Sequence, residues 1–400
     1  MHFDPFTPEA IEDPYPQYRR FREDAPVYWS DKIKSWCLFG YDDVRELFCD
    51  QRFSTDRSRA DKYKGRPPPA STELRTVQSD PPASTQVRKL LTLSLTPKVR
   101  AAQPLIDALI DEQVEVVEAA TERAVGDAQL AGEIDFIDEF AYALPVNVIA
   151  ELFAVPRDDW GQFQQWSFQI ARGMDHFYSK SDVGRALGEF ANYFFALASQ
   201  RRENPGEDLI SKLLEVENDG DRLNDVEVVS MCTTLVFAGH ETTVNLLGNG
   251  MLALLREPEQ LRMLAGGAVS PQAAMEELVR YDGPAQLISR TAVEEVEMRG
   301  QRIDPGKAVV AMLGSANRDP SEFDEPDSLD LARDPNNHLA FGLGAHFCPG
   351  ANLSRMETRA AFPAFLRRFP DIRLGDTPHS WRPTAVLRGL EHLPVRVSRA

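Results

Sequence analysis

The stretch that decides the fold is Phe341-Gly-Leu-Gly-Ala-His-Phe-Cys-Pro-Gly350, in which three glycines surround a single cysteine, Cys348. Glycines at this density let a backbone turn tightly and come very close to a flat partner. Residues 351–369 follow with leucines, alanines and arginines at helical spacing. The thiol is therefore expected at the N-terminus of a helix, where the helix dipole favours a thiolate. A thiolate in such a place suits a soft metal ion.

An inert buried cysteine in a glycine-rich loop is the alternative, and one cysteine alone would favour it. The whole loop reverses that preference, because it resembles the haem-ligand loop of the cytochrome P450 family, F-G-x-G-x-H-x-C-x-G. The matching positions are Phe341, Gly342, Gly344, His346, Cys348 and Gly350. The resemblance implies that Cys348 ligates the iron of haem b and that the other five residues belong to the haem-binding loop. It covers nearly the whole chain and is strongest from 224 to 360.

The bulk properties fit an enzyme of this kind. A chain of 400 residues with 42% hydrophobic content can bury a large core and still enclose a cofactor. Its net charge of −18 argues against nucleic acid as a partner. Four cysteines without a C-x-x-C pair indicate a reducing compartment. The N-terminus has no basic region followed by an apolar run, so we expect no signal peptide, no membrane anchor and a cytoplasmic location.

Periodicity predicts a mainly α fold with a minor β part, in a single domain spanning 1–400. An entry helix, strands near 26–29 and 36–39, and a helix at 41–49 are expected first. The other expected helices lie at 83–95, 102–122, 137–153, 158–173, 180–202, 225–256, 258–265 and 271–281. Further strands are expected at 291–298, 307–313 and 385–398. By resemblance, this is the cytochrome P450 fold, with haem between the long 225–256 helix and the cysteine loop.

The helix at 225–256 has a clear start and end. Asn224 can cap it, with Glu227 three residues later as in a capping box, and Pro258 stops it. Its length would be on the order of 48 Å. Because polar side chains crowd its middle, we interpret it as a buried core helix rather than a membrane span.

The middle of this helix reads Ala238-Gly-His-Glu-Thr-Thr243. Ala238 and Gly239 are small, so a ligand could approach the helix closely. Glu241 and Thr242 place a carboxylate beside a hydroxyl, a pair that can hold water and relay protons. The alternative is that the hydroxyls bond back to the i−4 carbonyls and bend the helix. The stretch also resembles the family's oxygen-activation motif, A-G-x-[D/E]-T-[T/S], which implies that Glu241 is the acid and Thr242 the alcohol that deliver protons to dioxygen.

Three cations are candidates for the haem propionates, because arginine suits bidentate contact with carboxylates. By resemblance these are Arg88, Arg290 and His346, although each could equally be an ordinary surface cation. The chain departs from the family at Ser84, where H-x-x-x-R would have a histidine. Glu277 and Arg280 match the E-x-x-R element and are interpreted as a structural ion pair rather than a catalytic one.

The resemblance implies a monooxygenase that inserts one oxygen atom of dioxygen into a lipophilic small molecule. Electrons would come from NAD(P)H through a ferredoxin reductase and a ferredoxin, and the enzyme is expected to be a monomer. The expected docking cations for the ferredoxin are Lys89, Lys98, Arg100, Arg355 and Arg359. The expected pocket segments are 56–79, 173–181, 237–242, 284–288 and 385–387.

Other classes of function remain as alternatives. A peroxide-driven haem enzyme or haem isomerase would need no electron partner, and Glu241 with Thr242 argues against either. A non-catalytic haem sensor is weakened by the lack of an appended signalling domain. A structural zinc site at His346 and Cys348 would have too few ligands.

Overall fold

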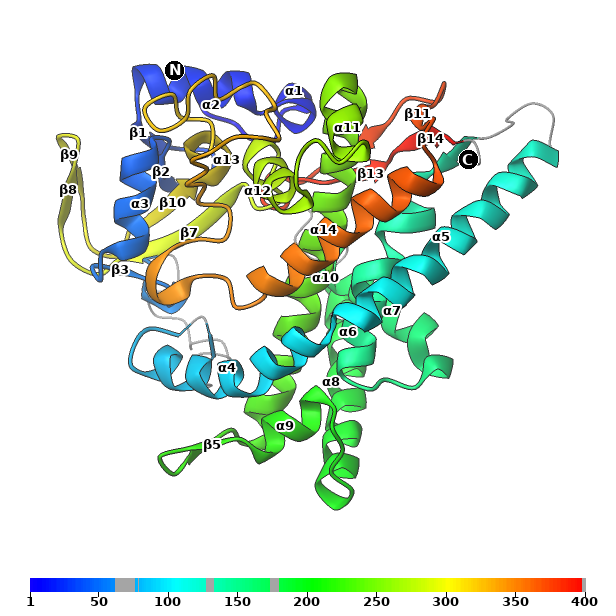
Figure 1. The fold of residues 1–400 in the computed structure, drawn as a ribbon. Helices are drawn as coiled ribbons and strands as arrows, with labels where there is room; N and C mark the ends of the chain where they lie inside the picture. The colour runs from blue at the N-terminus through cyan, green and yellow to red at the C-terminus, as the bar shows by residue number, and fades with distance from the viewer. Residues whose placement is uncertain (62–75, 78, 127–132, 173–179, 398–400) are drawn as a thin grey trace.

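A 32-residue helix, α10 (Asp225–Arg256), runs through the middle of the computed structural model (Figure 1). The predicted capping box fixes its start: Asn224 Oδ1 accepts from the Glu227 N–H at 2.9 Å, and Glu227 Oε2 accepts from the Asn224 N–H at 3.0 Å. The helix ends before Pro258, which disfavours a helical residue in front of it. Residues 243–254 are all buried, which confirms the predicted helix through the core.

The structure describes residues 1–61, 76–77, 79–126, 133–172 and 180–397. Most of the predicted 56–79 loop and the predicted 173–181 turn therefore lie outside the described residues. Besides α10, the α-helices are α1 (Pro8–Glu12), α2 (Tyr15–Asp24), α3 (Tyr41–Cys49), α4 (Ala83–Ala101), α5 (Gln103–Gly126), α6 (Ala143–Leu152), α7 (Trp160–Arg172), α8 (Lys180–Glu203), α9 (Leu209–Glu215), α11 (Pro258–Ala265), α12 (Pro271–Tyr281), α13 (Leu313–Ala316) and α14 (Ala351–Arg368). Single 3₁₀ turns cover Arg57–Arg59, Arg157–Asp159 and Gly344–His346, and a π turn covers Ile137–Ala141.

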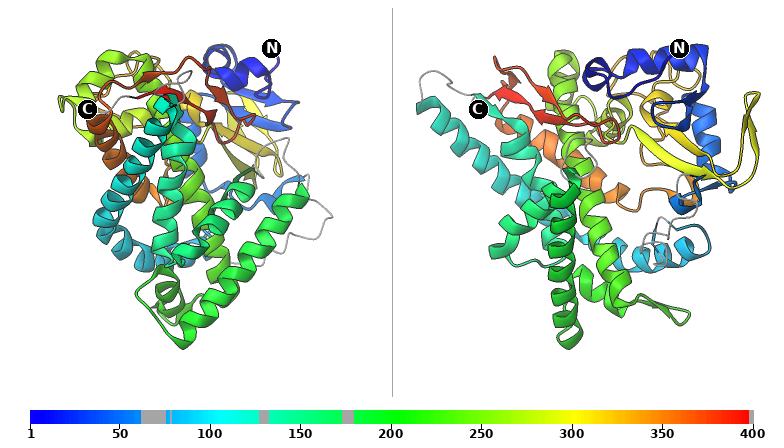
Figure 2. Two further views of the ribbon diagram at one scale, coloured as in Figure 1. Left: turned by 90° about the vertical axis from the view of Figure 1, so that its right-hand side faces the viewer. Right: turned by 180° about the vertical axis from the view of Figure 1, so that it is seen from behind.

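Helices pack around α10 on several sides. Helices α6, α7, α8, α12 and α14 all contact it. Figure 2 shows the same arrangement from two further sides, with α14 crossing α10. One large hydrophobic cluster joins residues of α4 to α10 with α14, so the core follows the long helix.

The β part lies beside this helical body. A five-stranded sheet has the order β1-β2-β10-β7-β3, in which only the β2–β10 pair is parallel. Its strands are β1 (Val27–Ser30), β2 (Ser35–Leu38), β3 (Phe53–Ser54), β7 (Leu287–Ala292) and β10 (Ala308–Met312). The smaller sheets use β4 (Glu133–Asp135), β5 (Glu217–Asn218), β6 (Asp221–Arg222), β8 (Val296–Met298), β9 (Gln301–Ile303), β11 (Arg373–Leu374), β12 (Ser380–Trp381), β13 (Leu390–His392) and β14 (Pro394–Arg396).

The central strand β10 is apolar on both faces. Val309 and Ala311 belong to the cluster that includes α3, whereas Val310 and Met312 belong to the cluster under the N-terminal helix α2. Successive side chains of a strand point to opposite faces, so this run of apolar residues is what a doubly covered strand requires. The sheet is thereby fixed between two layers of the N-terminal region.

The predicted mainly α fold with a minor β part is confirmed, with local differences. The predicted 137–153 helix is interrupted, because a π turn precedes α6. Helix α9 and the β5–β6 hairpin were not predicted, although Asp208 caps α9 by accepting from the Ser211 N–H at 3.0 Å. Within the described ranges, no helix is long and apolar enough to cross a membrane.

Close packing at Gly250 provides a test of the core around α10. A Cβ at this position would lie 2.8 Å from Phe362 Cζ of α14, and an aromatic ring cannot easily yield. Overpacking should outweigh the gain in helix propensity, so Gly250→Ala should lower the free energy of unfolding by on the order of 1 kcal/mol. Urea unfolding would measure this change.

Gly188 on α8 is the matched control, because a Cβ there meets nothing within 4 Å. Gly188→Ala should raise the free energy of unfolding by up to about 1 kcal/mol. Equal effects of the two substitutions would contradict the packing described for α10 and α14.

Candidate functional site

The loop that presents Cys348 is closed by its own backbone. The Cys348 N–H donates to the carbonyl oxygen of Phe341 at 2.9 Å, and the Phe347 N–H donates to Gly344 O at 3.1 Å. Gly342 and Gly344 have φ of +70° and +69°, a region that other residues rarely adopt. A Cβ on Gly344 would also lie 3.2 Å from the carbonyl oxygen of Phe48. The glycines are therefore needed for the turn and for its approach to α3.

Cys348 lies just before α14, as the sequence predicted, and is half-buried. Burial raises the pKa of its thiol, while the Gly350 and Ala351 N–H groups and the charge of Arg88 act in the opposite direction. Helix-terminal donors alone therefore do not make this sulfur a thiolate; a coordinated metal ion would. Pro349 has no N–H, so the donors are the two residues that follow it.

Two arginines and a histidine lie at the same loop. The Arg88 guanidinium of α4 donates to the carbonyl oxygen of Phe347, and His346 Nδ1 donates to Val77 O at 3.2 Å. Arg290 of β7 lies 5.4 Å from the ring centroid of Phe48. Burial, followed by the charges of Arg290 and Arg88, lowers the pKa of His346. The structure thus brings the three predicted anion-binding residues together.

Ser84 lies one turn before Arg88 on the same face of α4. Its side chain is 1% exposed, and its Oγ has no hydrogen-bond partner among the described residues. A buried hydroxyl without a partner costs free energy unless a ligand satisfies it. Two arginines, an imidazole and this hydroxyl fit a ligand with two carboxylates, as haem has, with Cys348 available for its iron.

The middle of α10 presents a small side chain on one face. Ala238 is exposed and Thr242, one turn later, is half-buried, although most of the helix around them is buried. Leu246, a further turn on, belongs to a small cluster against which Phe341 packs. Ala238 and Thr242 therefore lie on the face of α10 that turns toward the cysteine loop.

Gly239 is small for a different reason from the one expected. A Cβ at this position would lie 2.6 Å from Ile149 Cδ1 of α6. Its lack of a side chain lets α6 and α10 pack closely, so close ligand approach on this helix rests on Ala238.

Glu241 and Thr242 have separate partners. The Glu241 carboxylate is 3% exposed, forms an ion pair with Arg382, and accepts from Asn245 Nδ2 at 3.1 Å. The Thr242 hydroxyl donates to Ala238 O at 2.7 Å, which is the back-bonded arrangement that the sequence left open. Arg382, more than a hundred residues from Glu241 in sequence, was not predicted, and no local motif marks it.

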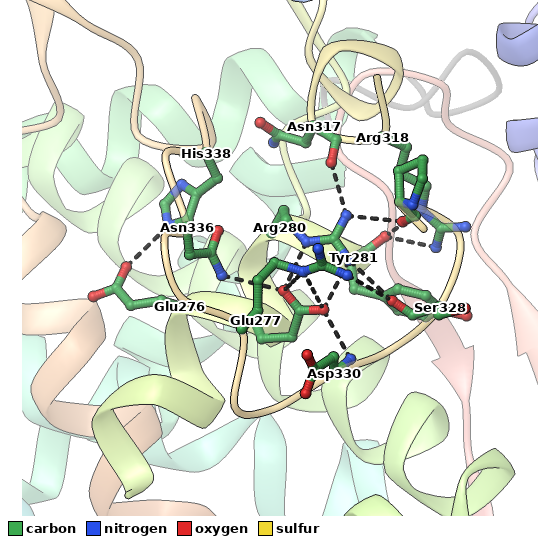
Figure 3. A network of polar contacts seen from close by, with 12 residues as sticks. Glu276, Glu277, Arg280, Tyr281, Asn317, Arg318, Ser328, Asp330, Asn336 and His338 are labelled. Atoms are coloured by element: carbon green, nitrogen blue, oxygen red, sulfur yellow. Dashed lines mark hydrogen bonds and ion pairs between the residues drawn. The ribbon is translucent and has the colours of Figure 1, made fainter. Parts of the chain in front are cut away.

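Glu277 and Arg280 of α12 form the predicted ion pair, with both side chains fully buried. Arg280 also donates to Asn317 O and Pro326 O, each at 2.9 Å, and Glu277 accepts from the Asp330 N–H at 2.9 Å (Figure 3). These contacts hold the irregular segment that leads to the cysteine loop. The interpretation of this pair as structural agrees with its surroundings.

The chain is similar to known proteins over most of its length. A family model described as Cytochrome P450 matches residues 13–265 and 271–380. The chain belongs to the cytochrome P450 family. It is therefore an oxidoreductase of the monooxygenase class, in a family whose cofactor is a thiolate-ligated haem.

Individual relatives cover nearly the whole chain. Cytochrome P450 monooxygenase PikC of Streptomyces venezuelae is 36% identical over 403 residues, which are 97% of this chain and 92% of that protein. Vitamin D(3) 25-hydroxylase of Pseudonocardia autotrophica is 36% identical over 400 residues, or 98% and 96% of the two chains. The solved structure of PksS, a bacillaene polyketide synthase cytochrome P450 of Bacillus subtilis 168, has a TM-score of 0.89 and 34% identity, and covers 99% of this chain and 100% of that one.

The predicted docking cations of this P450 are not all available. Arg355 is held by both carboxylate oxygens of Glu276, at 2.8 and 3.1 Å. Lys89 lies 3.6 Å from Asp219 in an exposed ion pair, which is worth little. Arg355 is therefore paired with Glu276, which offsets its charge, and docking of a ferredoxin at these cations stays a prediction.

Two buried ionisable side chains were missed by the sequence analysis. His240 accepts or donates at Nδ1 with Ser167 Oγ at 2.9 Å, and burial, with the charge of Arg382, lowers its pKa to about 3. Glu357 of α14 is 1% exposed, and neither of its oxygens has a hydrogen-bond partner within the described ranges. Burial raises the pKa of Glu357 well above its ordinary value, although the nearby Thr243 hydroxyl opposes this.

Glu357 should make stability depend on pH. Because its pKa is higher in the folded state, its contribution is fully present below the ordinary value of 4.5 and is lost as pH rises. Glu357→Gln has no carboxyl proton to lose. The free energy of unfolding of the variant minus that of the parent should therefore increase as pH rises from about 5 to about 8, by up to about 1.4 kcal/mol per pH unit. Urea unfolding at several pH values measures this difference.

Exposed Glu259 on α11 serves as the control. Glu259→Gln should give a curve parallel to that of the parent protein. A parallel curve for Glu357→Gln as well would mean that Glu357 is ionised in the folded state.

Proposed function

We propose that this P450 uses haem b to insert one oxygen atom of dioxygen into a C–H or C=C bond of a lipophilic small molecule. For a C–H bond the balance is substrate, dioxygen, two electrons and two protons giving hydroxylated product and water. The electrons come from NAD(P)H through a ferredoxin reductase and a ferredoxin. The observation that carries the proposal is the convergence of Cys348 with Arg88, Arg290 and His346 at one loop.

In this proposal Cys348 Sγ is the metal ligand, with the Gly350 and Ala351 N–H groups as donors to it. Arg88, Arg290 and His346 hold the propionates, and the Ser84 hydroxyl takes a place where the family has a histidine. Phe341, Gly342, Gly344 and Gly350 shape the loop against the haem, while Ala238 of α10 forms the opposite wall. Bound haem supplies the dioxygen and one-electron chemistry that side chains lack.

Proton delivery falls mainly to Thr242 in this scheme. Its hydroxyl donates to Ala238 O in this structure, so its oxygen can accept a hydrogen bond from water, and the hydroxyl passes its own proton on only after it turns away from Ala238 O. Glu241 acts as the acid only if its carboxylate leaves Arg382. That ion pair is the one observation that favours the alternative of a peroxide-driven enzyme, which needs no proton relay.

The substrate pocket is proposed between α10 and two C-terminal segments that lie side by side. The Gln286 N–H donates to Val386 O at 2.9 Å, and the Arg388 N–H donates to Pro284 O at 2.7 Å. Their apolar side chains, such as Ile288 and Leu387, suit a lipophilic molecule. The names of a vitamin D(3) hydroxylase and a polyketide synthase P450 among the relatives point in the same direction.

We also propose a cytoplasmic location and a monomeric state for the protein. All four cysteines lie in described residues and are free, which agrees with a cytoplasmic location. We propose a monomer made of a single domain over residues 1–400.

The spectrum of the reduced, carbon monoxide-bound protein tests the haem-thiolate assignment. The parent should show a Soret band at about 450 nm, and Cys348→Ser should lose it because serine cannot supply a thiolate. Cys232→Ser, at a buried cysteine of α10, is the control and should retain the band. A parent protein that binds haem without this band would refute the assignment.

Thr242→Ala tests the proton relay. Haem binding should survive, but product formed per NAD(P)H should fall severalfold while hydrogen peroxide rises, because dioxygen then leaves with two electrons and two protons. The assay uses a ferredoxin, its reductase and a substrate found by its shift of the haem spin state. Thr233 donates to Val229 O at 2.9 Å in the same way, so Thr233→Ala is the matched control and should stay coupled. Fully coupled turnover in Thr242→Ala would remove Thr242 from the relay.

A further inference from the structure

Each carboxylate oxygen of Glu276 in α12 accepts two hydrogen bonds, and the donors lie on three segments of the chain. Its Oε1 accepts from Arg355 Nε at 2.8 Å and from Gln272 Nε2 at 2.6 Å. Its Oε2 accepts from Arg355 Nη2 at 3.1 Å and from His338 Nε2 at 2.9 Å. Burial would raise the pKa of Glu276, but the His338 and Arg355 contacts outweigh it and lower the pKa to about 2. The carboxylate is therefore ionised and bound on every side.

His338 connects this carboxylate to the start of the cysteine loop. Its Nδ1 accepts from the Ala340 N–H at 3.2 Å, so the proton that it carries is on Nε2, facing Glu276. Figure 3 shows His338 turned toward Glu276, away from the Glu277–Arg280 pair. The histidine thus fixes the backbone one residue before Phe341.

Arg355 connects the same carboxylate to the other end of the loop. It lies on the first turns of α14, and its guanidinium lies 4.5 Å from the ring centroid of Phe341. The carbonyl oxygen of Phe341 accepts the Cys348 N–H, and the charge of Arg355 acts on the Cys348 sulfur. Two chains of contacts therefore connect Glu276 to Cys348. One runs through His338 and the backbone of the loop, and the other runs through Arg355 and the ring of Phe341.

We propose that Glu276 is a positioning residue for the haem iron: it ties His338 before the cysteine loop to Arg355 after it, and it neutralises the charge that Arg355 would otherwise exert on the Cys348 sulfur. The neighbouring Glu277 does a separate task, because its partners are Arg280, Arg333, Asn336 and the Asp330 N–H. The inference rests on the haem-thiolate function proposed above.

The pairing of the Glu276 and Arg355 charges predicts that removing one or the other shifts the iron reduction potential in opposite directions. Glu276→Gln leaves the Arg355 cation uncompensated near the sulfur, which favours ferrous iron and raises the reduction potential. Arg355→Gln leaves the Glu276 anion and removes the cation, which lowers the potential. A merely structural loosening of the loop would move both variants in the same direction, so opposite signs are specific to this proposal.

The experiment is a spectroelectrochemical titration of the full-length, haem-loaded protein without substrate, at one pH and salt concentration. We expect the ferrous-to-ferric ratio at a fixed potential to change about threefold in each single variant, with opposite signs; this equals about 28 mV at 59 mV per tenfold. The double variant Glu276→Gln/Arg355→Gln should return close to the parent. Exposed Glu259→Gln controls for the change in net charge and should not shift the potential.

Shifts of the same sign, or shifts no larger than that of Glu259→Gln, would overturn the proposal. If Glu276→Gln does not bind haem, Arg355→Gln is compared with Arg355→Lys, which retains the charge. The first should lower the potential and the second should not, and equal potentials would overturn it. A parent protein without the thiolate spectrum would instead defeat the proposed function itself.

Discussion

The buried ion pair of Glu277 and Arg280 is the interaction on which the rest of the site depends. Arg280 uses all five of its N–H donors, two on Glu277 and three on the carbonyl oxygens of Asn317, Pro326 and Ser328. A buried charge is tolerable only with such complete partnering, and removing one partner of a buried pair costs about 3–5 kcal/mol. The segment between β10 and the cysteine loop has little regular structure. The bonds from Arg280 therefore take the place of the regular backbone hydrogen bonds that a helix or strand would have.

The long helix α10 shows a second use of polar groups in a core. Asn249 donates to the carbonyl oxygens of Asp282 and Arg388, each at 3.1 Å, and Glu241 is paired with Arg382. Each contact ties α10 to a distant part of the chain. Apolar packing alone would hold the helix but would not define its rotation so closely. Defined rotation matters because Ala238 and Thr242 must face the cysteine loop.

Burial also disfavours the charged forms of several ionisable side chains. Burial raises the pKa values of Cys348 and Glu357 and lowers those of His240 and His346. Such groups are unfavourable in an ordinary core; Cys348 and His346 lie on the loop that would face the cofactor, whereas His240 faces Ser167 of α7.

The sequence by itself determined the elements whose signals are local. The capping box at Asn224, the proline after α10, the glycines around Cys348 and the i,i+3 spacing of Glu277 and Arg280 all act over a few residues, so the helix limits and the loop could be predicted. Only the tertiary structure decided which side chains pair. Arg382 reaches Glu241, Arg355 is taken by Glu276 and Gly239 makes room for Ile149. These partners come from segments far apart in the chain, and their meeting depends on how helices cross, which no local pattern encodes.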